Sequence, residues 1–343
     1  MPRQPIIQPE PPGDTRERDD ALRPRWLREI VGQEKVVQRL GIVLKSCKMN
    51  KEPLSHILFD GPPGLGKTTF ATVLPKELGT SIQMTSGPAL TSPKDLMPFL
   101  TNAEEGSIIF IDEIHRMPRI VEEFIYPAME DFRIDIVLGE GINARTLSLN
   151  LKRFTLIGAT TRSGMLSGPM RDRFKMHEHL EFYTVEELAQ IVRINARKLK
   201  AEITDDAALE LARRSRGTPR VANARLWWTR HYATSESDGR ITLETARAAL
   251  AMAEVDIQGL DRQDVRYLET LVGVFSGGPT GVEAIAATMN LPTDTLTDEV
   301  EPYLLREHFI VRTPRGRLAT AKAFEHLGRQ VPGEATAERE LFD

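Results

Sequence analysis

The chain has 343 residues, 41% of them hydrophobic, which is enough for two or three domains that each bury a core. Its 45 Lys and Arg against 49 Asp and Glu give a formal net charge of −4, which excludes a protein that attracts nucleic acid over its whole surface. Any site for a polyanion must therefore be a local patch. The single cysteine, Cys47, excludes an intramolecular disulfide and a site with several thiolate ligands.

The two ends of the chain differ in composition from the rest. Residues 1–20 hold five prolines and finish in a charged run, so we predict a disordered tail there, and we predict a second flexible tail over residues 332–343. No apolar run approaches the roughly 18 residues of a membrane span, and the N-terminus lacks the pattern of a secretion signal. Together with the single thiol, these features favour a cytoplasmic protein.

Residues 21–183 alternate short apolar runs with helix-like stretches. The runs 56–59, 107–111 and 154–158 have the composition of buried strands. This alternation is typical of a parallel sheet with helices on both faces, so we predict an α/β domain.

The strongest motif is Gly61-Pro-Pro-Gly-Leu-Gly-Lys-Thr68, which follows an apolar run and precedes a helix-like stretch. This is the context of a phosphate-binding P-loop. Backbone N–H groups of such a loop bind phosphates, and Gly64 and Gly66 allow close approach because they lack a Cβ. We expect Lys67 to reach the β- and γ-phosphates and Thr68 to bind Mg²⁺ through its hydroxyl. The sequence therefore predicts an ATP site that uses Mg²⁺.

Pro75 falls in the third turn of the helix expected after this loop, over residues 69–78. Because proline lacks a backbone N–H, we predict a kink or an early end of the helix at this residue.

Two further apolar runs end in polar residues. The first delivers Asp112, predicted to hold Mg²⁺ through water, and Glu113, predicted to polarise the attacking water. Alone, such a pair is more often a solvated strand end, but its distance from the P-loop favours a catalytic role. We expect His115 to be a structural neighbour rather than a base. The second run ends in two hydroxyls, of which Thr161 is the preferred sensor of the γ-phosphate and Thr160 the alternative.

Three arginines extend the candidate site. Arg171 and Arg173 lie in a segment rich in proline and glycine, where surface salt bridges are the alternative to a functional role. Arg220 opens a helix, where its charge opposes the helix dipole, and a nearby anion would explain that position.

Residues 184–257 are helical throughout and start with a capping box, Thr184 to Glu187. We predict a small helical domain with helices over residues 187–199, 205–215, 220–234 and 242–252.

Residues 258–331 have the element order of a winged helix. Helices are predicted near residues 261–275, 281–289 and 293–305, followed by a two-stranded ribbon over 309–319 that turns at 314–316. Charge is uneven, because 281–301 hold five acidic residues and no base, whereas 304–323 hold five bases and one acid. The basic ribbon predicts DNA contact through phosphates, and a solvated charged hairpin is the alternative.

Taken together, these motifs resemble the AAA+ ATPases and, within them, the RuvB family of bacterial Holliday-junction branch-migration motors. The resemblance covers about Leu22 to Gly328. It rests on residues 61–69, 112–116, 126–131, 158–162, 171–174, 216–220 and 312–317.

The resemblance implies further roles. Arg173 matches an arginine finger inserted toward the γ-phosphate of a neighbouring subunit, and Arg220 matches a second sensor that links the nucleotide to the lid. At the wing it favours Arg312 and Arg317 as DNA contacts, with Arg315 behind them. Other positions that match residues around the nucleotide are Leu22, Arg23, Thr69, Glu130, Asp131, Phe132 and Tyr183.

The resemblance also implies partners: a homohexameric ring around double-stranded DNA, the junction-binding protein RuvA and the resolving protein RuvC. RuvA would dock on a hairpin at residues 132–150. Their pattern predicts a two-stranded ribbon around Gly139-Glu-Gly141, with alternating apolar positions at Ile134, Ile136, Leu138, Leu147 and Leu149. An ordinary core hairpin is the alternative.

We therefore expect an ATP hydrolase that drives duplex DNA and migrates Holliday junctions during recombination and repair. The rival interpretation is a clamp-loader-like or protein-remodelling ATPase with the same site but no processive DNA transport. A DNA-binding regulator with an inactive site is opposed by the intact Lys67, Asp112 and Glu113.

Overall fold

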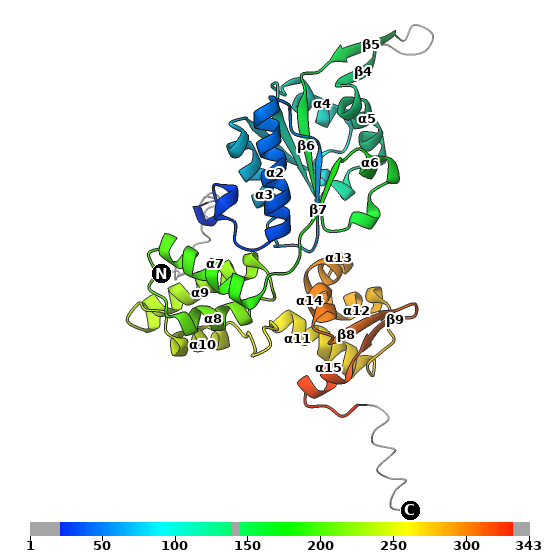
Figure 1. Ribbon diagram of the computed structural model, residues 1–343. Coiled ribbons are helices and arrows are strands. Elements are labelled where there is room, and N and C mark those ends of the chain that lie inside the picture. The colour runs from blue at the N-terminus through cyan, green and yellow to red at the C-terminus, as the bar shows by residue number, and fades with distance from the viewer. Residues whose placement is uncertain (1–20, 139–144, 332–343) are drawn as a thin grey trace, which may run out of the picture. The chain divides into compact units, whose positions relative to one another are not determined.

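The structure is a computed structural model that describes residues 21–138 and 145–331 (Figure 1). The predicted tails, 1–20 and 332–343, and the predicted turn at 139–141 lie outside the described residues. The chain forms two compact units, which we describe separately. Among the described residues, the first contains 21–61, Leu65–Glu181 and Ile194–Lys200, and the second contains Pro62–Gly64, Phe182–Arg193 and 201–331.

A five-stranded parallel sheet is the basis of the first unit. Its order is β2-β3-β6-β1-β7, with strands β1 (Ile57–Asp60), β2 (Ile82–Ser86), β3 (Ser107–Asp112), β6 (Phe154–Thr160) and β7 (Met176–His179). The three predicted strands are β1, β3 and β6, and they form the centre of the sheet. The sequence pattern missed β2 and β7 because β2 is only partly buried and β7 mixes His and Glu with a single Met.

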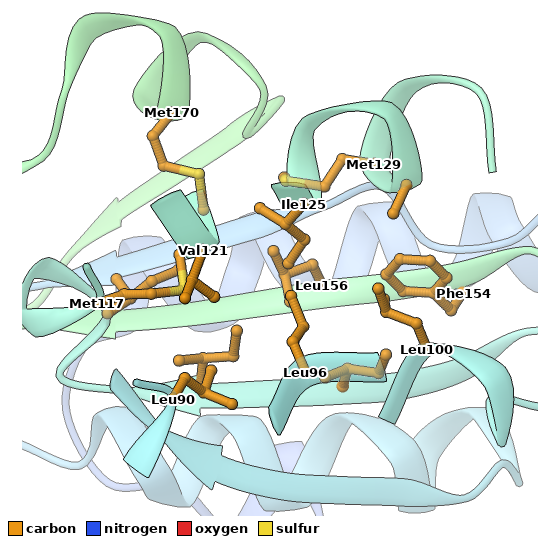
Figure 2. Packing of buried hydrophobic residues seen from close by; sticks show 14 of the residues in the cluster. Leu90, Leu96, Leu100, Met117, Val121, Ile125, Met129, Phe154, Leu156 and Met170 are labelled. Atoms are coloured by element: carbon orange, nitrogen blue, oxygen red, sulfur yellow. The ribbon is translucent and has the colours of Figure 1, made fainter. Parts of the chain in front are cut away.

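Helices cover both faces of this sheet, as the sequence predicted. They are α2 (Glu34–Asn50), α3 (Lys67–Leu78), α4 (Pro93–Thr101), α5 (Arg119–Glu130) and α6 (Gly168–Asp172). On one face, Leu96 of α4 and Ile125 of α5 pack around Phe154 and Leu156 of β6 (Figure 2). On the other face, the ring of Phe70 in α3 stacks on that of Phe59 in β1, with centroids 5.4 Å apart.

Helix α3 continues through Pro75 to Leu78, so the predicted early end at Pro75 is wrong. Pro75 lies only three residues before the end of the helix. Its missing N–H therefore leaves only the carbonyl one turn earlier without its helical partner, and the buried ring packs in the core.

An antiparallel hairpin follows α5. Its strands β4 (Arg133–Leu138) and β5 (Arg145–Asn150) pair Ile134 with Leu149 and Ile136 with Leu147. Ile134 is fully buried in the core of the first unit, whereas every residue of β5 is exposed. The two arms therefore differ, since only β4 contributes to the core.

Four helices make up the first part of the second unit, close to their predicted bounds. They are α7 (Val185–Lys198), which begins in this unit, α8 (Asp205–Arg213), α9 (Pro219–Glu236) and α10 (Leu243–Met252). The capping box is present, because the Thr184 N–H donates to Glu187 Oε2 at 2.8 Å and the Glu187 N–H donates to Thr184 Oγ1 at 3.2 Å.

The rest of the second unit is a winged helix. Its elements are α11 (Arg262–Glu269), α12 (Val282–Met289), α13 (Thr293–Thr295), α14 (Glu301–Arg306), β8 (Ile310–Thr313), β9 (Gly316–Ala319) and α15 (Ala321–His326). Two π-helical turns, 270–274 and 296–300, extend α11 and join α13 to α14. Tyr267, Leu304 and Phe309 lie at the centre of its core. The predicted helices and ribbon are confirmed, whereas α15 was not predicted. No helix in the described ranges is long and apolar enough to cross a membrane.

Candidate functional site

The order of the sheet brings three predicted motifs to one edge. Strand β6 lies between β1 and β3, and all three strands run in parallel. Their carboxyl ends therefore lie side by side, which is where open α/β sheets bind ligands. The glycine loop follows β1, Glu113 follows β3, and Thr161 follows β6.

The glycine loop leads directly into α3. Gly66 is the N-cap of this helix with a φ of 103°, and Gly64 has a φ of 80°. Residues with a side chain rarely adopt these conformations, which explains both glycines. Lys67 and Thr68 are the first two residues of α3, and Thr69 follows them. The Lys67 ammonium is buried and donates a hydrogen bond to the Gly61 carbonyl at 2.7 Å.

Thr68 and Asp112 face each other across the ends of α3 and β3. The Thr68 hydroxyl donates to Asp112 Oδ2 at 3.4 Å, and Asp112 Oδ1 accepts the Glu113 N–H at 2.9 Å. A hydroxyl and a carboxylate are oxygen ligands of the kind that Mg²⁺ takes, usually one or two per site with nucleotide phosphates and water. Among the described residues, no group of three or more His, Cys, Asp and Glu side chains could hold a metal ion. By its own chemistry, the Thr68 hydroxyl with the Asp112 carboxylate fits a magnesium ion.

Glu113 contacts both neighbouring polar residues. Its Oε2 accepts a hydrogen bond from the Thr161 hydroxyl at 3.2 Å and lies 3.3 Å from His115 Nδ1. Thr160 is fully buried, and its hydroxyl lies 2.9 Å from the same His115 nitrogen. Thr161 is therefore the hydroxyl that reaches Glu113, whereas Thr160 and the buried His115 ring form the layer beneath it.

Arg173 follows α6 and lies against its own domain. Its guanidinium is 4.0 Å from the centre of the Tyr126 ring, 3.1 Å from Glu130 Oε1 and 2.7 Å from the Pro169 carbonyl. The side chain is 19% exposed, and Nε is buried without a hydrogen-bond partner. Arg171 is exposed on the preceding helix. In this structure Arg173 thus forms an ion pair with Glu130 of its own subunit.

The remaining predicted nucleotide positions are spread over both units. In the first, the carbonyls of Leu22 and Arg23 accept hydrogen bonds from the Lys198 ammonium at 2.8 and 3.3 Å. Asp131 and Phe132 directly follow α5, where the Phe132 ring lies edge-on to Phe154. In the second unit, the Tyr183 N–H donates to the Gly217 carbonyl at 2.9 Å. Arg220 is exposed in the first turn of α9.

The predicted DNA-contacting arginines of the wing differ in their surroundings. Arg312 and Arg317 pair across the ribbon, and both bind the buried carboxylate of Glu301, Arg312 through Nε at 3.1 Å and Arg317 through Nε at 2.9 Å. Arg312 is 49% exposed and Arg317 only 18%. Arg315 is exposed at the turn. Sequence reasoning missed Glu301, since nothing in its acidic stretch distinguishes a buried carboxylate from its solvated neighbours.

Comparison with known proteins covers nearly the whole described chain. The family described as the "Holliday junction DNA helicase RuvB P-loop domain" matches residues 22–180, the "RuvB AAA lid domain" matches 183–256, and the "RuvB C-terminal winged helix domain" matches 257–328. The chain belongs to the RuvB family. The resemblance and the fold class expected from the sequence are thereby confirmed, and this RuvB-family chain is an AAA+ ATPase that binds nucleotide through its P-loop domain.

Individual RuvB relatives agree with this assignment. The Holliday junction branch migration complex subunit RuvB of Rhodopirellula baltica is 59% identical over 314 residues, which cover 92% of this chain and 86% of the relative. The solved Holliday junction branch migration motor RuvB of Thermotoga maritima superposes with a TM-score of 0.83 at 44% identity, over 91% of this chain and 100% of that chain. A point mutant of the Thermotoga protein gives a TM-score of 0.85 at 44% identity, over 91% and 99%.

Proposed function

We propose that this chain is an ATP-driven motor that pulls duplex DNA and so migrates Holliday junctions in recombination and repair. The observation that carries the proposal is the group of polar side chains at the sheet edge. Lys67, the Thr68–Asp112 pair and the Thr161–Glu113 pair lie at or beyond the carboxyl ends of three adjacent strands. The names of its relatives, a branch migration complex subunit and a branch migration motor, supply the substrate.

Hydrolysis at this site follows from the roles of the side chains. Lys67 and the loop N–H groups bind the β- and γ-phosphates, and Glu113 orients the attacking water and takes up its proton. Thr161 holds Glu113 in place and can exchange this contact for one with the γ-phosphate. Thr68 and Asp112 would hold Mg²⁺, which neutralises charge on the phosphates when it is bound.

Arg173 would act at the γ-phosphate of a neighbouring subunit, so hydrolysis would require a ring, which we propose to be a homohexamer. Nε of Arg173 is buried without a hydrogen-bond partner, and the residue lies at the end of a short helix. Both observations support a second position for this side chain, in which Nε is hydrogen-bonded. Glu130, which pairs with Arg173, and the two residues that follow it, Asp131 and Phe132, would complete that subunit boundary. Leu22, Arg23, Thr69 and Tyr183 would enclose the nucleotide, and Arg220 would link it to the lid.

The hairpin β4–β5 would dock RuvA. Its second strand is exposed throughout, and Leu147 and Leu149 are 50% and 39% exposed, an apolar pair that a core hairpin would bury. Within the junction-resolving complex, RuvC would join on the same DNA. Replacing Leu147 with Ser should abolish stimulation by the junction-binding partner while leaving ATP hydrolysis intact, and an unchanged stimulation would exclude this surface.

The domain division follows the roles. Residues 21–183 would form the ATPase domain, 184–257 the lid and 258–331 the winged helix, which the family matches at 22–180, 183–256 and 257–328 support. At the wing, the resemblance favours Arg312 and Arg317 as DNA contacts, with Arg315 behind them. The exposures support a different order, in which Arg315 at the turn and the exposed part of Arg312 contact DNA phosphates and Arg317, only 18% exposed and bound to Glu301, lies beneath them. A protein that acts on chromosomal junctions would work in the bacterial cytoplasm.

The deciding experiment is ATP-dependent conversion of a synthetic four-way junction to duplex products, with and without the cognate junction-binding protein. A Glu113→Gln variant is the control, because it removes the base but keeps the size of the side chain. Conversion that needs ATP, is stimulated by the partner and is lost in the variant supports the motor. ATP hydrolysis without junction conversion would favour a clamp-loader-like or remodelling ATPase instead.

A further inference from the structure

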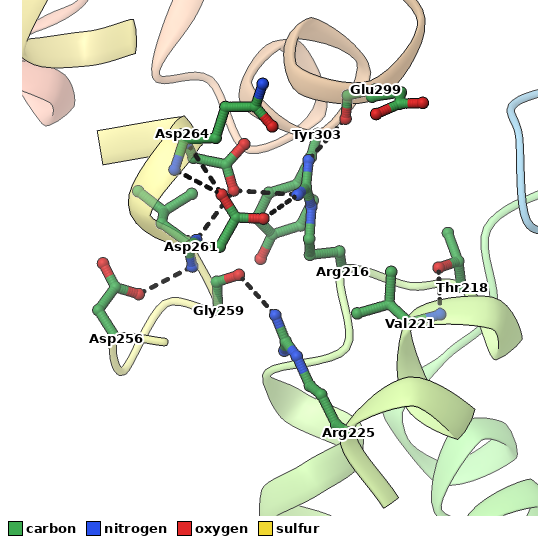
Figure 3. Close-up of polar contacts among 12 residues, drawn as sticks. Arg216, Thr218, Val221, Arg225, Asp256, Gly259, Asp261, Asp264, Glu299 and Tyr303 are labelled. Carbon is green, nitrogen blue, oxygen red and sulfur yellow. Dashed lines mark hydrogen bonds and ion pairs between the residues drawn. The ribbon is translucent and has the colours of Figure 1, made fainter. Parts of the chain in front are cut away.

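The arginine that begins the Arg216–Arg220 segment binds the winged helix (Figure 3). Arg216 Nη1 lies 3.1 Å from Asp261 Oδ2 and 3.0 Å from Asp264 Oδ2, and Nη2 donates to the Glu299 carbonyl at 2.8 Å. Its guanidinium also lies 5.1 Å from the centre of the Tyr303 ring. Asp264 is completely buried, so its contact with Arg216 is shielded from solvent.

A second arginine, Arg306 of α14, holds the same segment from the winged helix. It donates to the Arg216 carbonyl at 3.3 Å, and its guanidinium lies 4.4 Å from the centre of the Phe182 ring. Gly217 has a φ of 70°, and a Cβ there would collide with Arg306 Nη1. The positive φ is what favours glycine at this position, and a side chain there would also displace the end of Arg306.

Helix α14 joins this contact to the wing. Arg306 is its last residue, and Glu301, its first, holds Arg312 and Arg317 of the ribbon and accepts the Tyr267 hydroxyl at 3.0 Å. The carboxylate that binds the wing arginines and the guanidinium that packs on Gly217 therefore lie at opposite ends of one six-residue helix. Glu301 is fully buried, and its two carboxylate oxygens are bound by the wing arginines and by the Tyr267 hydroxyl. A shift of the wing arginines therefore changes the forces on α14.

We propose that α14 couples DNA binding at the wing to the ATPase site, with Arg306 and Arg216 as positioning residues for Arg220. This inference rests on the proposed function and deepens it. DNA phosphates that attract Arg312 weaken its hold on Glu301, α14 shifts, and Arg306 moves the segment that carries Arg220. Tyr183 moves with it, because its N–H is bound to the Gly217 carbonyl and its neighbour Phe182 lies under Arg306.

The test compares ATP hydrolysis with and without saturating duplex DNA in the full chain and in Arg306→Gln. Arg216→Gln is the second variant, and it should fold, because Asp264 can take up a proton when its partner is removed. Arg262→Gln is the matched control, since Arg262 is an exposed arginine of α11 that pairs with Glu254, and neither residue contacts α14 or the Arg216–Arg220 segment in the bonds described above. DNA affinity, basal ATPase rate and melting temperature are measured for each.

Coupling of this kind should lower the ratio of DNA-stimulated to basal ATP hydrolysis at least about five-fold in both variants, with DNA affinity unchanged. The control should keep the native stimulation. If DNA stimulates ATP hydrolysis by Arg306→Gln as strongly as by the native chain, the coupling is overturned and the proposed function is not. The same holds if the loss of stimulation parallels a loss of folding or of DNA binding. If the native chain is not stimulated by DNA and converts no junctions, the proposed function itself fails, and the coupling with it.

Discussion

The hydroxyl of Thr161 donates a hydrogen bond to Oε2 of Glu113 at 3.2 Å, although the two residues are 48 positions apart in the chain. The contact exists because β6 and β3 are neighbours and both end at the same edge of the sheet. A carboxylate held in this way has a defined orientation at the edge where the glycine loop also begins. Its orientation, more than its presence, is what a catalytic base requires.

Replacing Thr161 with Val should lower kcat for ATP hydrolysis by about 100-fold, because Glu113 loses the group that orients it. Nucleotide affinity should change little, since Lys67 and the loop remain. Steady-state kinetics and nucleotide titration measure the two effects. Thr101→Val is a suitable control, because this exposed hydroxyl donates to the Met97 carbonyl of its own helix, away from the sheet edge. A raised KM with an unchanged kcat would show that Thr161 binds substrate rather than positions the base.

Arg173→Ala should reduce ATP hydrolysis by about 10³-fold or more if the arginine acts on a neighbouring subunit. Mixing this variant with a Lys67→Ala variant should restore part of the activity, because a mixed ring contains boundaries with one intact P-loop and one intact Arg173. Arg171→Ala, exposed on the preceding helix, should retain full activity. No recovery on mixing, with both variants folded, would instead assign Arg173 to its own subunit or to its contact with Glu130.

The three arginines of the wing should respond differently to mutation. Arg315→Ala removes an exposed side chain, so it should lower DNA affinity and the salt dependence of binding by about one unit of slope without loss of stability. Arg317→Ala leaves the buried Glu301 with one guanidinium fewer, and should destabilise the winged helix by about 1–3 kcal/mol. Salt-dependent DNA titrations and thermal melts separate the two cases. Equal loss of stability in both variants would contradict this distinction.

Asp264 should make the stability of the second unit depend on pH. Burial raises the pKa of this carboxyl to about 7, with Asp261 acting in the same direction and Arg216 and Arg225 opposing it. The folded chain therefore binds a proton between about pH 4 and 7 that the unfolded chain releases. From this group alone, the free energy of unfolding falls as the pH rises through that range and is constant above it.

Asp264→Asn should remove this contribution, because an amide does not titrate. Melting temperatures of the native chain and the variant are measured from pH 5 to 8. As the pH rises toward 7, the melting temperature of the native chain should fall relative to that of the variant, and above pH 7 the two curves should run parallel. Parallel curves over the whole range would show that the Asp264 carboxyl ionises at its ordinary pKa in the folded chain.

Local sequence determined most of the elements and the identity of the chemical groups. The glycine loop, the apolar runs of β1, β3 and β6, the capping box at Thr184 and the ribbon at residues 309–319 all depend on residues close together in the chain. Their backbone conformations and periodicities are therefore visible without knowledge of the fold. The family resemblance depended on the same short motifs.

Only the tertiary structure decided which of these groups meet. The order of the sheet brings Glu113 to Thr161 and Asp112 to Thr68, and packing of α14 under the ribbon brings Arg312 and Arg317 to Glu301. It also decided that Pro75 stays within α3 and that β5 stays exposed. Contacts of this kind join residues far apart in the chain, and their energies come from burial and charge in a shared core, which no local pattern records.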